Sequence, residues 1–270
     1  MVLSKFTNKS FFTRLLSGIV LVALMLATII PGGNILFVAN LLISVVGVYE
    51  LYKVLGIEKN SLGITGYIAV LAYYAVLYFD KKEYMMILMV VFLMCLLAQY
   101  VFMFPKYKTE QISNAIMSML YAGVMLSYLY SVREGNNGAY TVWLIFLCSW
   151  GSDTCAYLAG VAFGKHKMAP VLSPKKSVGG VVGAAALGAI YATIFSSNIT
   201  MSINPVAGFA IICAVGALIS MVGDLAASAI KRNHDIKDYG KLIPGHGGIM
   251  DRFDSVIYVA PVIWILLQIF

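Results

Sequence analysis

The sequence predicts an all-α fold, namely a polytopic integral membrane protein with about nine transmembrane helices and a cytoplasmic N-terminus. Of its 270 residues, 61% are hydrophobic and only 11% are charged, against about 25% charged residues in an average soluble domain. The apolar residues form long blocks that follow neither the helical period nor the strand period. A chain of this size has too little interior for so much apolar surface, so a soluble globular protein is excluded and the excess is expected to face lipid.

Each apolar block has roughly the length of one membrane crossing. A hydrocarbon core of ~30 Å needs about 20 apolar residues in a helix. The sequence has no alternating ten-residue segments typical of a barrel, and bare backbone polar groups are not tolerated in lipid, so helices are expected. The predicted spans are Phe12 to Ile30, Ile35 to Leu55, Ile64 to Phe79, Tyr84 to Phe104, Ile112 to Val132, Tyr140 to Phe163, Val178 to Phe195, Val206 to Ala227 and Ser255 to Phe270.

The basic residues are distributed unevenly between the two sides of the predicted membrane. With a cytoplasmic N-terminus, 16 of the 19 lysines and arginines fall in cytoplasmic segments, and only Lys81, Lys82 and Arg133 fall outside. The positive-inside rule favours this orientation and puts the C-terminus outside. Because no small-x-small cleavage pattern follows the first block, it is predicted to be a retained helix. We expect a multi-pass protein of the cell (inner) membrane with its active site on the cytoplasmic side.

Residues 1–270 are expected to form a single membrane domain whose halves have different roles. Residues 1–135 have short connections and few intramembrane charges, chiefly Glu50 near a helix end, and are predicted to be mainly scaffold helices. Residues 136–270 contain two long cytoplasmic loops, about Gly164 to Ser177 and about Ser228 to Asp254, rich in Lys, Asp, Gly and His. The catalytic helices and loops are expected in this second half.

A polar stripe marks the cytoplasmic end of the eighth span. Its members lie within about 100° of one helical face, and they are Asp224, Ser228, Lys231 and Arg232. The two bases alone could be side chains that snorkel to the interface. That alternative does not explain Asp224, because a carboxylate inside an apolar run is costly and indicates a functional site.

A glycine-rich loop precedes the last span. Pro244, Gly245, Gly247 and Gly248 surround His246, a composition that brings backbone N–H groups close to an anion. The dipole of the following helix would favour a phosphate at its N-terminus. Asp251 and Asp254 are expected in the first turn of that helix, where ordinary acidic capping is the alternative interpretation.

The two carboxylates Asp224 and Asp251 are predicted to come from the ends of different helices on one side of the membrane, amid Lys231, Arg232 and Arg252. Mg²⁺ usually takes one or two protein carboxylates together with phosphate oxygens and water. Basic side chains would hold the remaining phosphate charge. This combination predicts phosphoryl or nucleotidyl transfer at the membrane surface.

The other predicted cytoplasmic loop is also rich in basic residues. Its run Ser173-Pro174-Lys175-Lys176-Ser177 is predicted to be a compact turn between helices, with an anchor to anionic headgroups as the alternative. Upstream, Asp153 is a second carboxylate within an apolar run, on one helical face with Trp150 and Tyr157. We expect Asp153 to face the bundle interior.

The segment from Ser228 to Asp254, SAIKRNHDIKDYGKLIPGHGGIMDRFD, resembles the signature of the CDP-diacylglycerol synthases, also called phosphatidate cytidylyltransferases. A serine, a Lys-Arg pair, Lys-Asp and a Pro-Gly-His-Gly-Gly loop closing on Asp-Arg-x-Asp stand here at the family's spacing. Upstream, Asp153, Gly164, Lys165 and the SPKKS run also look like the family. The resemblance covers the second half well and the first half by hydropathy.

The resemblance implies cytidylyl transfer from CTP to phosphatidic acid in phospholipid biosynthesis, giving CDP-diacylglycerol and pyrophosphate. It also implies Mg²⁺ at Asp224 and Asp251, a second cation such as K⁺, and a homodimer; no nucleic acid is expected as a partner. The catalytic candidates are Asp224, Asp251, Lys231, Arg232 and Arg252. The substrate-binding candidates are Asp153, Ser173, Lys175, Lys176, Ser177, Ser228, Lys237, Asp238, His246, Gly247, Gly248 and Asp254.

The sequence departs from the family at one position and leaves two other functions open. The family's SPKKT turn is followed, two residues on, by a glutamate, whereas Gly179 stands here, so any role of that acid in orienting Lys175 or Lys176 is missing. A CTP-dependent lipid kinase would use similar residues but release CDP. A transporter could line a path with Asp153 and Asp224, although no matching pair of interrupted helices suggests inverted repeats.

Overall fold

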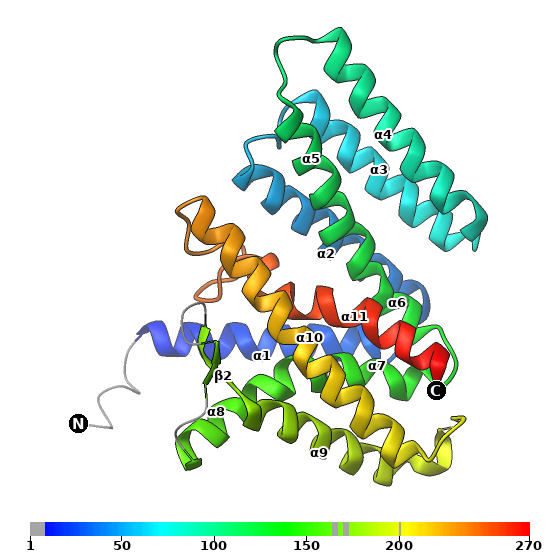
Figure 1. Cartoon of the computed structure of the whole chain (residues 1–270), viewed down its shortest axis with the longest axis vertical. Coiled ribbons are helices and arrows are strands. Elements are labelled where there is room, and N and C mark those ends of the chain that lie inside the picture. The colour runs from blue at the N-terminus through cyan, green and yellow to red at the C-terminus, as the bar shows by residue number, and fades with distance from the viewer. Residues whose placement is uncertain (1–8, 164–166, 170–172, 200) are drawn as a thin grey trace. The chain divides into compact units, whose positions relative to one another are not determined.

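The computed structural model describes residues 9–163, 167–169, 173–199 and 201–270, with side chains at 12–161, 179–199 and 201–270. Within these residues the chain is almost entirely helical, so the predicted all-α class is confirmed (Figure 1). Nine helical stretches are long and apolar enough to cross a membrane in this described part, as predicted. The chain divides into two compact units, Met1–Ser127 with Lys237–Arg252, and Tyr128–Ile236 with Phe253–Phe270.

The first unit is built from the first five long spans and the loop that precedes the last helix. Asn60 caps its third helix by accepting the N–H of Gly63 at 3.0 Å, which satisfies an otherwise unpaired donor. Helices α3 and α4 pack side by side in this unit (Figure 1). Its helices are α1 (Lys9–Ile29), α2 (Gly33–Val54), α3 (Ser61–Tyr78), α4 (Met85–Phe102) and α5 (Thr109–Ser118), continued by a π-helical segment (Met119–Met125) and the first two residues of α6 (Leu126–Arg133), whose remainder belongs to the second unit.

A buried polar network joins α2 to α3 and to the first residue of α6. The hydroxyls of Ser44 and Tyr74 lie 2.6 Å apart. The amide of Asn40 donates to the Tyr74 hydroxyl at 3.2 Å and to the Leu126 carbonyl at 3.1 Å. Buried polar groups are costly unless they are paired, so this network fixes the register of the helices that it joins.

The second unit contains α7 (Gly138–Phe146), a π-helical segment (Leu147–Gly151), α8 (Ser152–Phe163), α9 (Val178–Phe195) and α10 (Pro205–Asn233), and most of α11 (Met250–Ile269). Helices α9 and α10 lie side by side (Figure 1). Glycines allow the close approach, because a Cβ at Gly188 would lie 2.6 Å from Cys213 Sγ and 2.7 Å from the carbonyl oxygen of Phe209. Small residues at such crossings are typical of membrane helices.

The loop between α8 and α9 forms a short hairpin where a turn was predicted. Strands β1 (Lys167–Ala169) and β2 (Ser173–Ser177) pair antiparallel, with Lys167 opposite Ser177 and Ala169 opposite Ser173. The SPKKS run is therefore strand β2 rather than a turn. Backbone pairing satisfies donors and acceptors that a loop beside an apolar bundle would leave exposed.

The edges of the last two helices differ from the predicted spans. Helix α10 continues to Asn233, beyond the predicted end at Ala227, and α11 begins at Met250, before the predicted start at Ser255. Polar residues at both ends project beyond the apolar block, so hydropathy alone underestimates the helices. As a result Ser228, Lys231 and Arg232 are helical.

The close packing of α9 on α10 gives a stability prediction. Gly188→Ala puts a Cβ against backbone as well as Cys213, and overpacking of this kind costs about 2 kcal/mol. We expect the apparent unfolding temperature in detergent, followed by tryptophan fluorescence, to fall by about 4 to 8 °C. The matched control is Gly160→Ala in α8, where nothing lies within 4 Å of an added Cβ. Equal unfolding temperatures for the two variants would contradict this packing.

Candidate active site

The loop between α10 and α11 folds into a tight turn around the predicted glycine motif. The N–H of Ile243 donates to the carbonyl of Gly247 at 2.8 Å, and the N–H of His246 donates to the carbonyl of Ile243 at 2.9 Å. Gly245 and Gly247 have φ of 75° and 86°, which side-chain-bearing residues rarely adopt. The two glycines therefore allow the turn that leads into α11.

Asp251 is held at the start of α11 by this loop. Its side chain is only 6% exposed, and its Oδ2 accepts the N–H of Tyr239 at 2.8 Å and the N–H of Gly248 at 2.9 Å. Hydrogen bonds to one carboxylate oxygen fix the orientation of the whole group. Asp251 lies in the first turn of the helix, as predicted.

Glu50 of α2 contacts the same loop, which the sequence did not predict. Its Oε1 accepts the N–H of Ile249 at 3.1 Å, and its Oε2 accepts the N–H of Met250 at 2.9 Å. Glu50 is 4% exposed although it lies in a membrane span. The signal was present, because a carboxylate inside an apolar run is a functional hypothesis by default, but the sequence does not reveal its partner 199 residues away.

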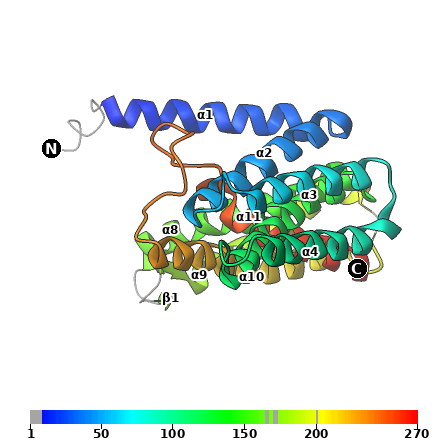
Figure 2. The same cartoon turned by 90° about the horizontal axis from the view of Figure 1, so that it is seen from above.

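Helix α1 also contacts the loop (Figure 2). The Ser17 hydroxyl donates to the carbonyl of Pro244 at 2.8 Å, and a Cβ at Gly245 would lie 2.8 Å from Arg14 Cγ. Among the described residues, the Nδ1 of His246 and the Nε of Arg252 are buried without a hydrogen-bond partner. Two nitrogens of this kind beside a glycine turn are suited to contact an anionic ligand.

The second unit contains the predicted stripe on α10. Asp224, Ser228 and Lys231 are half-buried and Arg232 is exposed, on one continuous helix. The preceding residue Gly223 packs on α11, since a Cβ there would lie 2.9 Å from the carbonyl oxygen of Asp254. The stripe therefore begins at a helix crossing.

Asp254 does not cap α11. The helix begins at Met250, so Asp254 lies in its second turn, and the expectation of both acids in the first turn holds only for Asp251. The Oδ1 of Asp254 accepts the N–H of Ser255 at 2.8 Å. Helix-terminal capping, the alternative interpretation of the sequence, is therefore wrong for Asp254.

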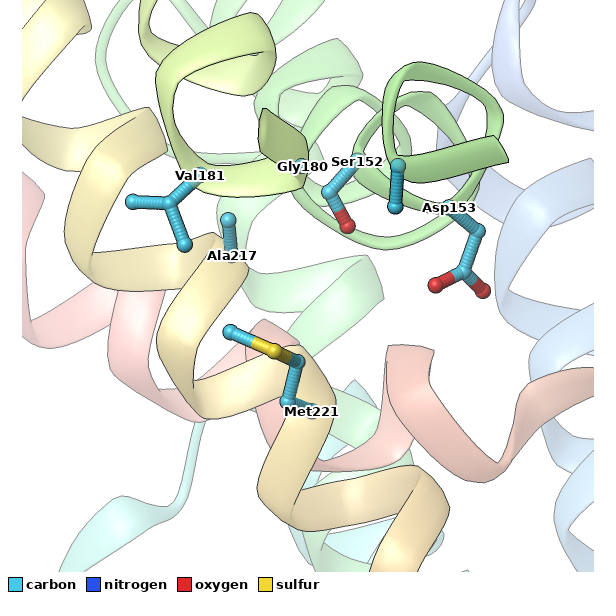
Figure 3. Close-up of a pocket in the computed structure, with 7 residues that line it drawn as sticks. Ser152, Asp153, Gly180, Val181, Ala217 and Met221 are labelled. Carbon is cyan, nitrogen blue, oxygen red and sulfur yellow. The ribbon is translucent and has the colours of Figure 1, made fainter. Parts of the chain in front are cut away.

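Asp153 lines a small pocket in the second unit (Figure 3). It shares the pocket with small residues of α8, α9 and α10, namely Ser152, Ala156, Gly180 and Ala217, and with Val181 and Met221. The Asp153 side chain is exposed, and its predicted orientation toward the bundle interior rather than lipid stays a prediction. Trp150 lies in the π-helical segment and Tyr157 in α8; the wider π turn shifts the predicted common face by breaking the 3.6-residue period.

The remaining candidates divide between the two units. Lys237, Asp238, His246, Gly247, Gly248 and Arg252 lie with Asp251 in the first unit. The backbone of Ser173, Lys175, Lys176 and Ser177 forms β2, and the side chains of these residues, like Gly164 and Lys165, lie outside the described residues. Within the described part, no group of three or more His, Cys, Asp and Glu side chains converges on a metal position.

The fold and this loop define a polytopic membrane protein with a carboxylate-bearing, glycine-rich loop at a helix N-terminus. Residues 12–270 match the model of the cytidylyltransferase family. The chain belongs to this family.

Individual relatives agree with the family match. The chain is 30% identical to the phosphatidate cytidylyltransferase of Bacillus subtilis (strain 168), over 95% of this chain and 97% of that protein. It is 31% identical to the phosphatidate cytidylyltransferase of Staphylococcus saprophyticus, over 94% and 98% of the two chains. The similarity to the protein of that name from Staphylococcus aureus (strain COL) is 38% over 56% of this chain and 57% of the relative.

The turn at Gly247 predicts a site-specific loss of activity. A Cβ at Gly247 would lie 2.7 Å from Asp251 Oδ2, at a φ of 86°. We expect Gly247→Ala to lower cytidylyl transfer at least about tenfold, because it displaces Asp251, which we predict to be catalytic, and catalytic groups have to be held within about 0.5 Å of the productive geometry.

The control for this prediction separates backbone strain from displacement of Asp251. Gly56 has a similar φ of 69°, with nothing within 4 Å of an added Cβ, so Gly56→Ala carries the cost of the left-handed conformation alone. We expect the Gly56 variant to retain most of its activity per folded molecule. Equal activities in the two variants would refute the prediction that close contact between position 247 and the Asp251 carboxylate matters for activity.

Proposed function

We propose that this protein transfers the cytidylyl group of CTP to phosphatidic acid, forming CDP-diacylglycerol and pyrophosphate. An oxygen of the lipid phosphate forms a bond to the α-phosphorus of CTP, and the bond from that phosphorus to the bridging oxygen of pyrophosphate breaks. The lipid phosphate is already an anion, so no dedicated general base is needed. The family match over residues 12–270 and the names of the relatives support this reaction.

The geometry that carries the proposal is the fixed carboxylate of Asp251 at the end of a glycine turn. Two anionic substrates repel one another, so the protein has to hold both and neutralise charge. The buried Nε of Arg252, a cationic donor, lies in the same unit as this carboxylate. We assign Arg252, Lys231, Arg232, Lys175 and Lys176 to holding phosphates, as charge-assisted donors.

We propose Asp224 and Asp251 as carboxylates for Mg²⁺. The donor set fits this ion, because Mg²⁺ is commonly bound by one or two carboxylates, with phosphate and water oxygens completing the shell. The two N–H bonds to Asp251 Oδ2 fit as well, since metal-binding carboxylates are themselves oriented by hydrogen bonds. When bound, Mg²⁺ would neutralise charge on the reacting phosphates.

The remaining candidate residues are proposed to shape the substrate sites. Next to the glycine turn, they are Lys237, Asp238 and His246, and Asp238 lies beside Gly247, whose added Cβ would be 3.3 Å from the Cβ of Asp238. On α10 and α11 they are Ser228 and Asp254, and on α8 Asp153. A monovalent cation such as K⁺ and a homodimer are further proposals from the family resemblance.

The reaction is tested with purified protein, radiolabelled CTP, phosphatidic acid and Mg²⁺, with lipid and soluble products resolved. We expect a labelled CDP-lipid and unlabelled pyrophosphate in equal amounts when the label is in cytosine. A phosphorylated lipid and CDP would instead identify a lipid kinase. Absence of both products under every cation condition, including K⁺ and Na⁺, would refute the proposed function.

The metal assignment predicts that Asp224→Asn and Asp251→Asn each lower turnover by at least about a hundredfold, because an amide does not neutralise a divalent cation as a carboxylate does. Turnover is measured on folded, detergent-extracted protein over a range of Mg²⁺ concentrations. The matched control is Asp80→Asn, a surface carboxylate that pairs with Lys82 at 3.0 Å, for which we expect unchanged turnover. Near-normal activity in both site variants would eliminate the metal assignment.

We also propose that the N-terminus and the loop Lys237–Arg252 lie in the cytoplasm. The distribution of basic residues supports this orientation. Cysteines introduced one at a time in place of Lys241 and Lys81, both exposed, should differ in how fast they are labelled in sealed right-side-out vesicles. A membrane-impermeant thiol reagent should label Lys81→Cys at once and Lys241→Cys only after the vesicles are opened. The reverse order would invert the proposed topology.

A further inference from the structure

Glu50 is a buried carboxylate with no role in the proposed chemistry. Both of its oxygens accept backbone N–H groups, from Ile249 at 3.1 Å and from Met250 at 2.9 Å. Met250 is the first residue of α11 and Ile249 directly precedes it, so both N–H groups lie at the helix N-terminus and have no partner within the helix. A side chain of α2 therefore supplies the acceptors that these two N–H groups lack locally.

The loop is shaped around the Glu50 carboxylate. A Cβ at Gly240 or at Gly248 would collide with the carboxylate oxygens of Glu50. Met250 in turn packs against α2, since a Cβ at Gly47 would lie 3.2 Å from Met250 Sδ. Glycine at 240 and 248 is therefore required by the approach of Glu50.

Glu50 and Asp251 hold consecutive amides of one short segment. The N–H of Gly248 donates to Asp251, and the next two N–H groups, of Ile249 and Met250, donate to Glu50. Loss of the hydrogen bonds from Ile249 and Met250 to Glu50 would allow the backbone that carries Asp251 to move. We propose that Glu50 is a positioning residue, which fixes the first turn of α11 and so orients the Asp251 carboxylate; this inference rests on the proposed function of Asp251.

The cost of burying Glu50 supports a positioning role. A carboxylate that is 4% exposed in a membrane span loses most of its hydration. A Ser, Asn or Asp at position 249 would accept the N–H of residue 251 or 252, so it would not replace Glu50 as the acceptor for Ile249 and Met250. Capping from α2 ties the start of α11 to a rigid helix, which a local cap would not do.

The first test compares amide hydrogen exchange in Glu50→Gln and wild-type protein. Glutamine has the same shape but offers one acceptor oxygen and a donor amide, so one of the two N–H groups loses its partner. We expect exchange across residues 239–252 to increase about tenfold or more, with exchange in α3 and α4 unchanged. Unchanged exchange in the loop would overturn the proposal.

The second test measures the Mg²⁺ concentration for half-maximal activity and the KM for phosphatidic acid. Loss of a residue that orients a metal ligand typically costs about 10- to 100-fold in metal affinity or activity. We expect Glu50→Gln to raise the half-maximal Mg²⁺ concentration or lower kcat by about tenfold, with the KM for phosphatidic acid changed less than about twofold. A loss of activity that merely follows the fraction of unfolded protein would overturn the proposal.

Matched variants complete the experiment. Glu110→Gln, an exposed acid in the first turn of α5, makes the same chemical change and should leave both readouts unchanged. Glu50→Asp keeps both acceptor oxygens but shortens the side chain, and it should fall between Gln and wild type in both readouts; it carries the test if the Gln variant does not fold. Wild-type protein that forms no CDP-lipid would refute the proposed function alone, because the exchange measurement does not depend on turnover.

Discussion

The structure depends on one constraint at the start of α11. The backbone N–H groups at this helix N-terminus have no acceptor within the helix, so acceptors have to come from elsewhere. Two buried carboxylates from different parts of the chain, Glu50 and Asp251, meet this need. The same hydrogen bonds pin the glycine turn, since Tyr239 also donates to Asp251. The need to pair buried backbone N–H groups thus constrains the conformation of the loop.

The membrane architecture was predictable from sequence because the lipid acts on composition over whole spans. All nine predicted spans have a helical counterpart in the described residues. The predicted boundaries are wrong at the end of α10 and at the start of α11, and the predicted turn is wrong at the hairpin of β1 and β2. Local polar residues, which hydropathy does not describe, form these three places. In these places hydrogen-bond geometry, rather than apolar content, decides where an element begins and ends.

The candidate site was predictable only where its residues are close in sequence. The spacing from His246 to Asp251 indicates a glycine turn at a helix start, and that turn is present. Glu50 had no such neighbours, so a carboxylate at the end of α2 was interpreted as part of a scaffold. The pocket that Asp153 lines was not predictable either, because its other residues are small or apolar and come from three helices that are distant in sequence.

The position of Glu50 changes the expected division of labour along the chain. Lys237–Arg252, the segment with the densest motif, belongs to the same compact unit as α1 to α5. The division into a scaffold half at 1–135 and a catalytic half at 136–270 remains a prediction, but the first half supplies Glu50, which accepts the N–H groups of Ile249 and Met250, and packs against Met250 at Gly47. In the proposed arrangement, Glu50 of α2 would limit the movement of Asp251 at the start of α11, and this role would account for a charge retained in an apolar span.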